Sequence, residues 1–381
     1  MRRLGCFFLV FALFFCAPIR AEAAAPEVKA KSACLMDIQT GTVLYEQNAD
    51  APLPPASVTK VMTMLLVMEA LACGRIKLTD KVTASEAAAA KGGSQIYLKV
   101  GEQMSVEDML KSVAVSSAND CACALAEHIA GSEAAFVEKM NARAAELGMK
   151  NTHFVNCTGL DDGEDAKKHL TTARDIALMS RELMKSHRGI TKYTTIWMDT
   201  VRGGTFGLSN TNKLVRFYPG ATGLKTGFTS GAGYCLSATA EKEGLGLIAV
   251  VMGSETSQDR FQACKSLLDH GFAGYTLLNL APDGELSVPV DLGIMDAVTV
   301  VPGEVTQFLV DKGQAASVNV KIVLDEQVSA PVSRGQKLGT MTITCGEQVL
   351  KQLPLVAEKE VPRLTYWQIF GDLLKKTLGG K

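Results

Sequence analysis

The chain has 381 residues, with 39 basic against 40 acidic side chains for a formal net charge of −1, and 47% of it is hydrophobic. This balance excludes a disordered tail, a collagen-like repeat and a strongly basic protein that binds nucleic acid by neutralising phosphates. The length predicts one large domain and a smaller one, with enough apolar material for two cores.

Residues 1–23 are expected to be a secretory signal peptide that does not belong to the fold. Arg2 and Arg3 supply a positive start, residues 6–17 form an apolar run, and residues 21–23 (Ala-Glu-Ala) fit a small-x-small cleavage site. The apolar run is too short to span a bilayer comfortably. The mature protein is therefore expected to be exported.

The next segment, residues 24–280, is expected to form one domain with strands at both ends and helices between them. Alternation predicts a hairpin over 33–47, and the almost wholly apolar stretch 57–72 predicts a buried helix. Thr171 or Thr172 is a plausible N-cap for a later helix. The other expected elements are helices at 104–115, 117–130, 132–147, 171–187 and 258–271, and strands at 222–229, 234–241 and 245–252. This order favours an α/β (α+β) domain with one antiparallel sheet and a helical subdomain.

Residues 281–359 are expected to form a small all-β domain, because short alternating segments replace the helical period there. These segments are 286–290, 297–301, 307–310, 318–323, 339–344 and 349–354. The tail, 360–381, predicts an amphipathic helix with an apolar face of Tyr366, Ile369, Phe370, Leu373, Leu374 and Leu378. Its surplus of lysine favours a membrane surface, and a helix docked on its own protein is the alternative.

The cysteines offer no obvious chemistry. Eight remain once the signal peptide is removed, without zinc-ligand spacing and without a Cys-x-x-Cys pair. They are interpreted as buried small hydrophobic residues, with one or two disulfides left open in an oxidising compartment. Cys121 and Cys123 lie two apart on an expected helix, so they are poor candidates for pairing with each other. None of the five histidines stands in a His-Glu-x-x-His motif, and no Gly-x-Ser-x-Gly elbow occurs.

A nucleophile and its base are instead predicted at Ser57-Val58-Thr59-Lys60. This segment opens the buried helix, where Ser57 in the first turn and Lys60 three residues later share one face. A lysine acts as a base only when it is neutral, and apolar surroundings and the positive end of the helix dipole both disfavour its ammonium form. Taken alone, Ser57 is equally compatible with an ordinary helix N-cap.

Two further segments change that balance. Ser117-Ala118-Asn119 is expected to begin another helix, with a hydroxyl that can relay a proton and an amide that can hold a peptide carbonyl. Lys225-Thr226-Gly227 is expected on a strand, where the glycine lets a substrate backbone approach and the Lys-Thr pair can receive a carboxylate. In this order the three segments match the Ser-x-x-Lys, Ser-x-Asn and Lys-Thr-Gly set of penicillin-binding proteins and serine β-lactamases.

The mature chain as a whole resembles low-molecular-weight penicillin-binding proteins of the D-alanyl-D-alanine carboxypeptidase type. The resemblance also covers Thr-Ala-Arg-Asp at 172–175, Gly-Leu-Lys-Thr-Gly-Phe-Thr at 223–229, the β-rich second domain and the tail helix. It implies a penicillin-binding transpeptidase-like fold. It further implies removal of the terminal D-alanine from peptidoglycan stem pentapeptides, without a cofactor or metal and with β-lactams as covalent inhibitors. The expected location is the periplasm or cell-wall space, at the outer face of the cytoplasmic membrane.

The resemblance also implies roles for individual residues. Ser57 is the acylated nucleophile, Lys60 its general base, and Ser117 with Asn119 the second motif. The substrate carboxylate lies near Lys225 and Thr226, beside Gly227, with Arg260 as a further candidate. The oxyanion hole consists of the backbone N–H groups of Ser57 and Phe228.

Two departures from the family pattern concern the substrate-binding side. Thr211 stands where some relatives carry arginine, and Phe228 stands where others carry histidine. The second is tolerable, because only the backbone of that residue is needed.

Three alternatives stay open at this point. A β-lactamase shares the motifs, but the chain has Ser-Ala-Asn in place of Ser-Asp-Asn and lacks a Glu-x-x-Leu-Asn segment between the second and third motifs. A DD-endopeptidase would use the same residues. A wall-binding protein with an inactive site is the alternative of another class.

Overall fold

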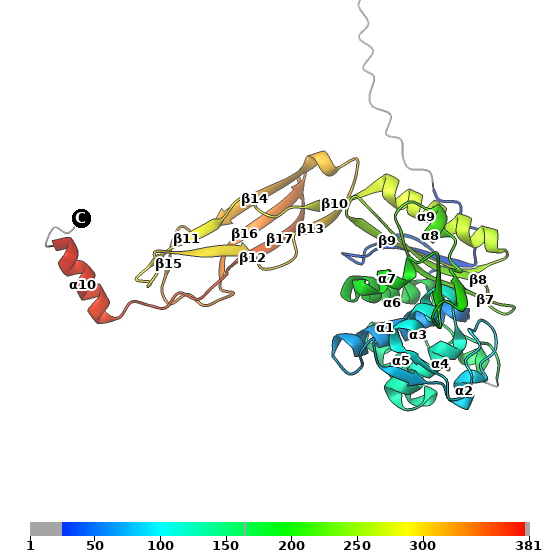
Figure 1. The fold of residues 1–381 in the computed structure, drawn as a ribbon. Helices are drawn as coiled ribbons and strands as arrows, with labels where there is room; N and C mark the ends of the chain where they lie inside the picture. The colour runs from blue at the N-terminus through cyan, green and yellow to red at the C-terminus, as the bar shows by residue number, and fades with distance from the viewer. Residues whose placement is uncertain (1–24, 164, 378–381) are drawn as a thin grey trace, which may run out of the picture.

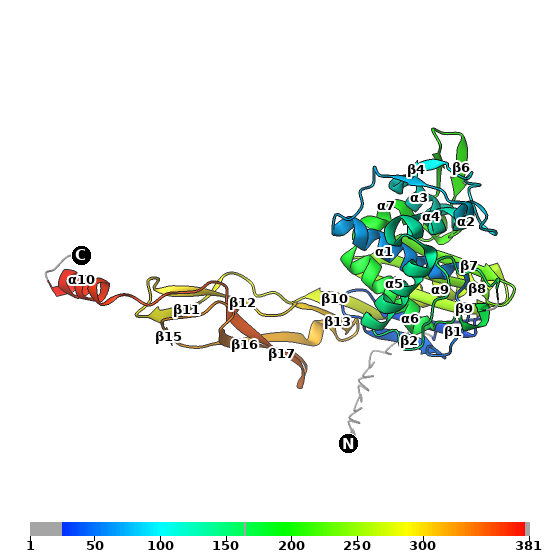
Figure 2. The same cartoon turned by 90° about the horizontal axis from the view of Figure 1, so that it is seen from below.

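The computed structural model describes residues 25–163 and 165–377, and the expected signal peptide lies outside them. The described chain has a helix-rich first unit and a narrower β-rich unit that extends away from it (Figure 1). Figure 2 shows the same arrangement from below, with the last helix, α10 (Tyr366–Thr377), at the end remote from the first unit.

A five-stranded antiparallel sheet forms the centre of the first unit. Its order is β2-β1-β9-β8-β7, and the bounds are β1 Ser32–Asp37, β2 Val43–Gln47, β7 Ala221–Thr229, β8 Gly233–Lys242 and β9 Leu245–Ser254. The first strand pairs with the last, with Leu35 opposite Ala249. This confirms the predicted sheet, in which strands from both ends of the domain meet.

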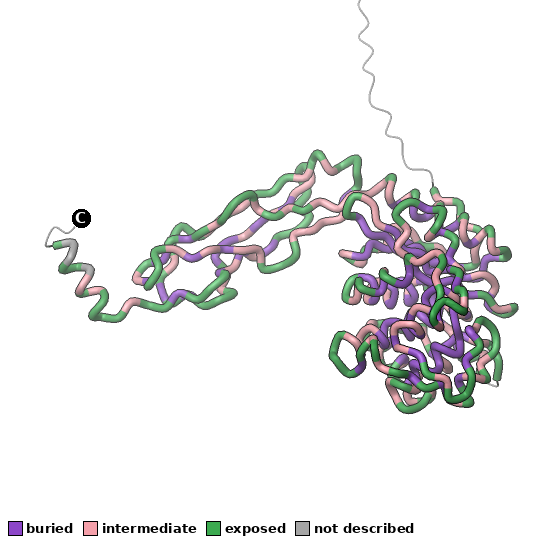
Figure 3. The backbone as a smooth tube through the Cα atoms, in the orientation of Figure 1, coloured by how far each residue is buried: buried purple, intermediate pink, exposed green. Residues whose placement is uncertain are grey.

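Both faces of this sheet are covered by helices. Successive side chains of a strand point to opposite faces, so Met36 and Val250 join the core under the helical subdomain, whereas Leu35 and Val251 join a second core under α9 (Ser257–Gly274). Every residue of β9 is therefore buried. Figure 3 shows the buried residues gathered in this unit.

The helical subdomain lies on the face of the sheet opposite α9 (Figure 1). Its predicted helices are present, and Thr172 is the N-cap of α6 (Ala173–Ser186), since its hydroxyl accepts the Asp175 N–H at 3.1 Å. The bounds are α1 Lys60–Ala72, α3 Val106–Ser116, α4 Asn119–Ala130, α5 Glu133–Glu146 and α6 Ala173–Ser186. Shorter helices are η1 Ala56–Thr59, α2 Glu86–Ala89, η2 Ala166–Lys168, η3 Arg188–Ile190, α7 Thr191–Thr194 and α8 Leu214–Phe217. Two small ribbons, β3 (Lys81–Thr83) with β4 (Gln103–Ser105) and β5 (Met198–Val201) with β6 (Phe206–Ser209), were not predicted, because three or four residues are too few to show alternation.

The second unit confirms the predicted all-β domain. A six-stranded sheet runs in the order β14-β16-β17-β12-β11-β15 around its own apolar core. The bounds are β11 Leu286–Asp291, β12 Ala297–Pro302, β14 Val318–Leu324, β15 Val328–Ser329, β16 Lys337–Cys345 and β17 Gln348–Ala357, with η4 at Ala315–Ser317. The remaining predicted strand, β13 (Gln307–Asp311), leaves this sheet and pairs with β10 (Tyr275–Asn279), a strand that the sequence analysis did not predict. This ribbon crosses the boundary expected at 280/281.

Within the described residues the tail helix occupies Tyr366–Thr377, so it begins later than the expected residue 360, and Leu378, expected on its apolar face, lies outside the described residues. Its apolar side chains are exposed, with 91% of Tyr366 and 83% of Trp367 accessible. Across the described ranges, no helix combines the length and the apolar character needed to cross a bilayer.

Candidate active site

The site begins at the junction of η1 and α1. The structure corrects the position expected for Ser57: it lies in the short 3₁₀ turn η1, ahead of the α-helix that begins at Lys60. Residues i and i+3 eclipse each other in a 3₁₀ turn, so the two side chains align, with Lys60 Nζ 2.9 Å from Ser57 Oγ. The turn starts at Ala56, which has a left-handed φ of 48°. Ser57 is half-buried, whereas Lys60 has no exposed surface.

Burial sets the protonation of Lys60. Loss of solvent around the ammonium group lowers the pKa of Lys60 from its usual 10.5 to about 7. Nζ also donates a hydrogen bond to the carbonyl oxygen of Thr158 at 2.8 Å. A neutral amine with one N–H directed at that carbonyl keeps its lone pair for the Ser57 hydroxyl, which is the arrangement of a base beside a nucleophile.

The loop that carries Thr158 was missed by the sequence analysis. Its Asn156 side chain accepts hydrogen bonds from the backbone N–H groups of Thr158 and Gly159, at 3.1 and 2.6 Å. Gly159 has a φ of 82°, and a Cβ there would lie 1.8 Å from the carbonyl oxygen of Ala56. The only signal in the sequence is the turn-forming pair of asparagine and glycine, which does not say what the turn packs against.

A buried histidine supports the same turn and was also missed. Thr59 Oγ1 donates to the Ala56 carbonyl at 2.9 Å and lies 2.9 Å from His169 Nε2. The Val155 N–H donates to His169 Nδ1 at 3.3 Å, so the neutral Nε2–H tautomer satisfies both contacts. Burial lowers the pKa of His169 to about 4, with a smaller contribution from the charge of His153.

The second motif lies between two helices. Ser117 does not begin a helix as expected: it is the C-cap of α3 in a left-handed conformation (φ 64°), and α4 begins at Asn119. A helix that ends in this conformation turns the chain sharply. Because of this turn, the Ser-x-Asn segment connects two helices, although its sequence pattern is that of one continuous helix.

Asn119 is committed to the protein itself. Its Nδ2 donates to the carbonyl of Gly92 at 2.7 Å, and its backbone N–H donates to the carbonyl of Ser94 at 2.7 Å. Its Oδ1 is buried without a hydrogen-bond partner in the described part of the chain. The amide thus holds a peptide carbonyl as expected of it, but this carbonyl belongs to the 92–94 loop.

Strand β7 brings the third motif against η1. A Cβ added to Gly227 would lie 2.7 Å from the carbonyl oxygen of Pro55 and 3.0 Å from the backbone nitrogen of Ser57. Only glycine allows this approach. The strand therefore places the backbone of Gly227 and Phe228 next to the Ser57 N–H, while the Phe228 side chain is 53% exposed and packs on Tyr234 with ring centroids 4.3 Å apart.

Two further basic side chains lie around β7. Lys225 is buried, and the loss of solvent, with the nearby charges of Lys60 and Arg260, lowers its pKa well below the usual range. Its Nζ donates to the carbonyl of Thr226 at 2.8 Å. Arg260 on α9 is also buried, and it donates to the carbonyl of Gly227 at 3.0 Å. Arg260 thus braces the strand from behind.

Thr211, one of the two departures from the family pattern, connects the second and third motifs. Its hydroxyl accepts a hydrogen bond from Thr226 Oγ1 at 2.6 Å, and its N–H donates to the carbonyl of Val115 at 3.1 Å. Val115 lies two residues before Ser117. The structure therefore links the second motif to the third through Thr211, and it packs the third motif against the turn that carries Ser57.

Comparison with known proteins agrees with this geometry. Residues 19–256 match the family described as D-alanyl-D-alanine carboxypeptidase, and residues 275–363 match the C-terminal domain of penicillin-binding protein 5. The chain is 43% identical over 357 residues to the D-alanyl-D-alanine carboxypeptidase DacF of Bacillus subtilis, covering 92% of this chain and 90% of that protein. It is 33% identical over 364 residues to DacA of Escherichia coli, covering 92% and 88%.

Solved structures give the same picture. Penicillin-binding protein 5 of Haemophilus influenzae superposes with a TM-score of 0.76 at 32% identity, covering 89% of this chain and 99% of that one. A penicillin-binding protein of Listeria monocytogenes in its ampicillin-bound form superposes with a TM-score of 0.59 at 34% identity, covering 64% and 98%.

Proposed function

Because this chain belongs to the D-alanyl-D-alanine carboxypeptidase family and is a serine-type peptidase of that class, we propose that it acts through an acyl-enzyme on Ser57. The observation that carries the proposal is the 2.9 Å separation between Ser57 Oγ and the Nζ of Lys60, whose pKa is about 7. A half-buried hydroxyl beside a buried amine, of which a substantial fraction is neutral near pH 7, is an activated nucleophile.

In the acylation step, Ser57 Oγ attacks the carbonyl carbon between the two terminal D-alanines. The Lys60 amine takes the hydroxyl proton as the C–O bond forms. The C–N bond then breaks, Ser117 relays a proton to the leaving amine, and free D-alanine departs. Water hydrolyses the resulting ester, with Lys60 again as the base, and regenerates Ser57.

The backbone around Ser57 supplies the electrostatic part of catalysis. We assign the oxyanion hole to the N–H groups of Ser57 and Phe228, because β7 packs so closely on η1 that a Cβ added to Gly227 would lie 3.0 Å from the Ser57 nitrogen. Donors fixed in advance near the developing negative charge lower the barrier without reorganising during the reaction.

The substrate carboxylate is assigned to Lys225 and Thr226. Both belong to the strand that lies against η1, and Asn119 shapes the opposite rim through its bond to Gly92. Arg260 is assigned a supporting part here, since its guanidinium is bonded to the Gly227 carbonyl. A carboxylate that binds beside Lys225 favours the ammonium form of this lysine, and the resulting pair is shielded from water.

The decisive experiment measures D-alanine released from a stem pentapeptide by the purified mature chain. Wild type should release one D-alanine per peptide, and Ser57→Ala should release none. Turnover of a β-lactam in place of a persistent adduct would instead indicate a β-lactamase, and cleavage of cross-linked muropeptides without D-alanine release would indicate a DD-endopeptidase. Absence of both D-alanine release and penicillin labelling would indicate an inactive wall-binding protein.

We further propose that the mature protein is exported and attached to the outer face of the cytoplasmic membrane through α10. Support comes from the exposed apolar side chains of this helix and from its position beyond the all-β domain of 281–359 (Figure 1). That domain would act as a spacer between the membrane and the first unit. An amphipathic helix of this kind binds by burying its apolar face in the headgroup region. Sedimentation with anionic vesicles should retain the full chain and lose Trp367→Glu. The matched control, Val349→Glu at an exposed position of β17, should still bind. Equal binding by all three proteins would contradict the proposal.

A further inference from the structure

A second cluster of reactive side chains lies beside the active site and takes no part in the proposed mechanism. It contains Cys123 on α4, Glu133 at the start of α5 and Cys157 in the loop that holds Lys60. One donor atom from each lies within 4.8 Å of the others. Both thiols are fully buried, and every cysteine in the described ranges is free.

The hydrogen bonds of the cluster orient its donor atoms toward one another. The Cys157 thiol lies 3.1 Å from Glu133 Oε1, and the Cys123 thiol lies 3.9 Å from Glu133 Oε2. Lys91 Nζ donates to Glu133 Oε2 at 2.6 Å. One carboxylate oxygen is thus next to a thiol, while the other is held by a cation from outside the cluster. A ligating carboxylate typically has this kind of outer partner.

The donor set suits a borderline-soft divalent cation. With the ion bound, two thiolates and one carboxylate carry three negative charges, which Lys91 and the divalent ion balance. Without the ion, the two thiols are protonated and Lys91 alone balances the carboxylate. The buried site is therefore neutral in both states. Ligands about 2.0–2.3 Å from a tetrahedral Zn²⁺ lie about 3.3–3.8 Å apart. A contraction of roughly 1 Å from the 4.8 Å limit therefore suffices. Binding releases the two thiol protons to solvent.

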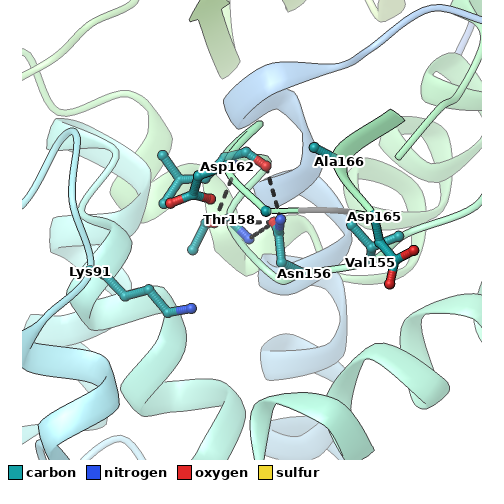
Figure 4. A pocket seen from close by; sticks show the side chains of 9 residues that line it. Lys91, Val155, Asn156, Thr158, Asp162, Asp165 and Ala166 are labelled. Atoms are coloured by element: carbon teal, nitrogen blue, oxygen red, sulfur yellow. Dashed lines mark hydrogen bonds between the residues drawn. The ribbon is translucent and has the colours of Figure 1, made fainter. Parts of the chain in front are cut away.

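A pocket lies next to the loop that carries Cys157. It has a volume of about 300 Å³ and is lined by Lys91, Asn156 and Thr158, the last two of which flank Cys157. Figure 4 shows the Lys91 side chain directed toward the loop that carries Asn156 and Thr158. The Lys91 and Glu133 side chains are 22% and 23% exposed, whereas both thiols are fully buried. Water from the pocket can supply a fourth ligand.

We propose that Cys123, Cys157 and Glu133 form a Zn²⁺ site that ties α4 and α5 to the loop holding the catalytic lysine. The loop is the functional link: the Cys157 carbonyl accepts a hydrogen bond from Thr63 on α1 at 2.7 Å, and the next carbonyl, of Thr158, accepts from Lys60. The ion is structural, and it restrains the distance between the second motif and the base without touching substrate. This proposal is independent of the acyl-enzyme on Ser57.

The test uses the full mature chain, reduced, treated with a chelator and then titrated with ZnCl₂ against a chromophoric chelator. Wild type should bind about one equivalent tightly, and Co²⁺ in its place should give a thiolate-to-metal charge-transfer band. Cys157→Ala and Cys123→Ala should lose both signals. Cys264→Ala, which removes a buried thiol from the other core, should keep them. Lys91→Ala should weaken Zn²⁺ binding about 10–100-fold.

Folding of each variant is checked by fluorescent-penicillin labelling, and Glu133→Gln provides a variant of almost unchanged size. Free thiols are counted in denaturant before titration. One tight equivalent that depends on the cluster and not on Cys264 supports the site. The proposal is overturned by reduced, labelled wild type that binds no Zn²⁺, by binding that survives loss of both cluster cysteines, or by a Cys123–Cys157 disulfide in the exported protein.

Discussion

Lys60 donates a hydrogen bond to the backbone carbonyl of Thr158 at 2.8 Å, although 98 residues separate them in the chain. This contact orients the amine toward Ser57 and removes it from water. The pKa of about 7 follows from that burial. The catalytic base and its orienting partner thus come from a helix start and from a distant loop.

The buried Lys60 should destabilise the fold in a pH-dependent way. Its pKa in the folded protein (about 7) lies below the unfolded value of 10.5, so between these values the unfolded chain binds the proton more strongly. The free energy of unfolding should therefore rise with pH from about 7 to 10.5, by a few kcal/mol on the order of the shift.

Lys60→Met should abolish this pH dependence and stabilise the protein most at or below pH 7, offset by about 1–3 kcal/mol for the unpaired Thr158 carbonyl. Urea unfolding at several pH values measures both effects. Lys185→Met is the control, because this lysine is exposed, and its slope should equal that of wild type. An unchanged slope in Lys60→Met would contradict the assigned pKa.

Gly227→Ala should reduce acylation by penicillin about 10²–10³-fold, the effect of losing one oxyanion donor. The added methyl would meet the Pro55 carbonyl at 2.7 Å and push β7 away from η1. Stopped-flow labelling measures the rate. Gly207→Ala is a matched control on strand β6, since nothing lies within 4 Å of its Cβ position. Equal acylation rates for the two variants would contradict the close approach of β7 to η1 as the reason for the glycine.

Gly159→Ala should lower both the free energy of unfolding and the rate of acylation by penicillin. The alanine must adopt a φ of 82°, at about 1 kcal/mol, and its Cβ would also occupy the position of the Ala56 carbonyl, 1.8 Å away. Gly148→Ala has a similar φ of 72° with open space around it, so it should show the backbone cost alone. Thermal melts and penicillin labelling of both variants separate the two contributions. If Gly159→Ala matched Gly148→Ala, the loop would not position η1.

His169 should make the protein acid-sensitive. Its pKa in the folded state, about 4, lies below the usual 6.5, so its contribution to stability is complete above pH 6.5 and is lost as the pH falls toward 4. The expected loss is on the order of 3 kcal/mol. NMR titration of the imidazole should show a midpoint near 4, whereas a midpoint near 6.5 would refute the buried neutral tautomer bonded to Thr59.

The sequence predicted most of the fold because its signals were local. The alternation around β1, the short apolar run of β9 between glycine-bearing turns and the long apolar run of α1 are each visible in a single sequence. The hydroxyl cap at Thr172 marks a helix start by itself. The motif residues were found through their order and spacing. The motifs come together in space because strands from the two ends of the first domain pair in one antiparallel sheet. The strand patterns at both ends of that domain indicated this pairing.

The missed features depend on contacts between distant segments. Nothing in the residues around Thr158 indicates that its carbonyl meets Lys60, and nothing around His169 indicates that it bonds Thr59. Ser117 was placed on a helix because the apolar period continues through it, whereas the left-handed turn there follows from packing of α3 against α4. β10 lacks a marked alternation and acquires its strand form by pairing with β13.

The most direct test of the account is the rate of covalent labelling by a fluorescent penicillin as a function of pH, for wild type and Ser57→Ala. The account predicts a persistent adduct in wild type alone, formed with a rate constant that rises as the pH increases through about 7, where Lys60 loses its proton. An adduct that survives in Ser57→Ala, or a wild-type rate that does not change across this range, would contradict it.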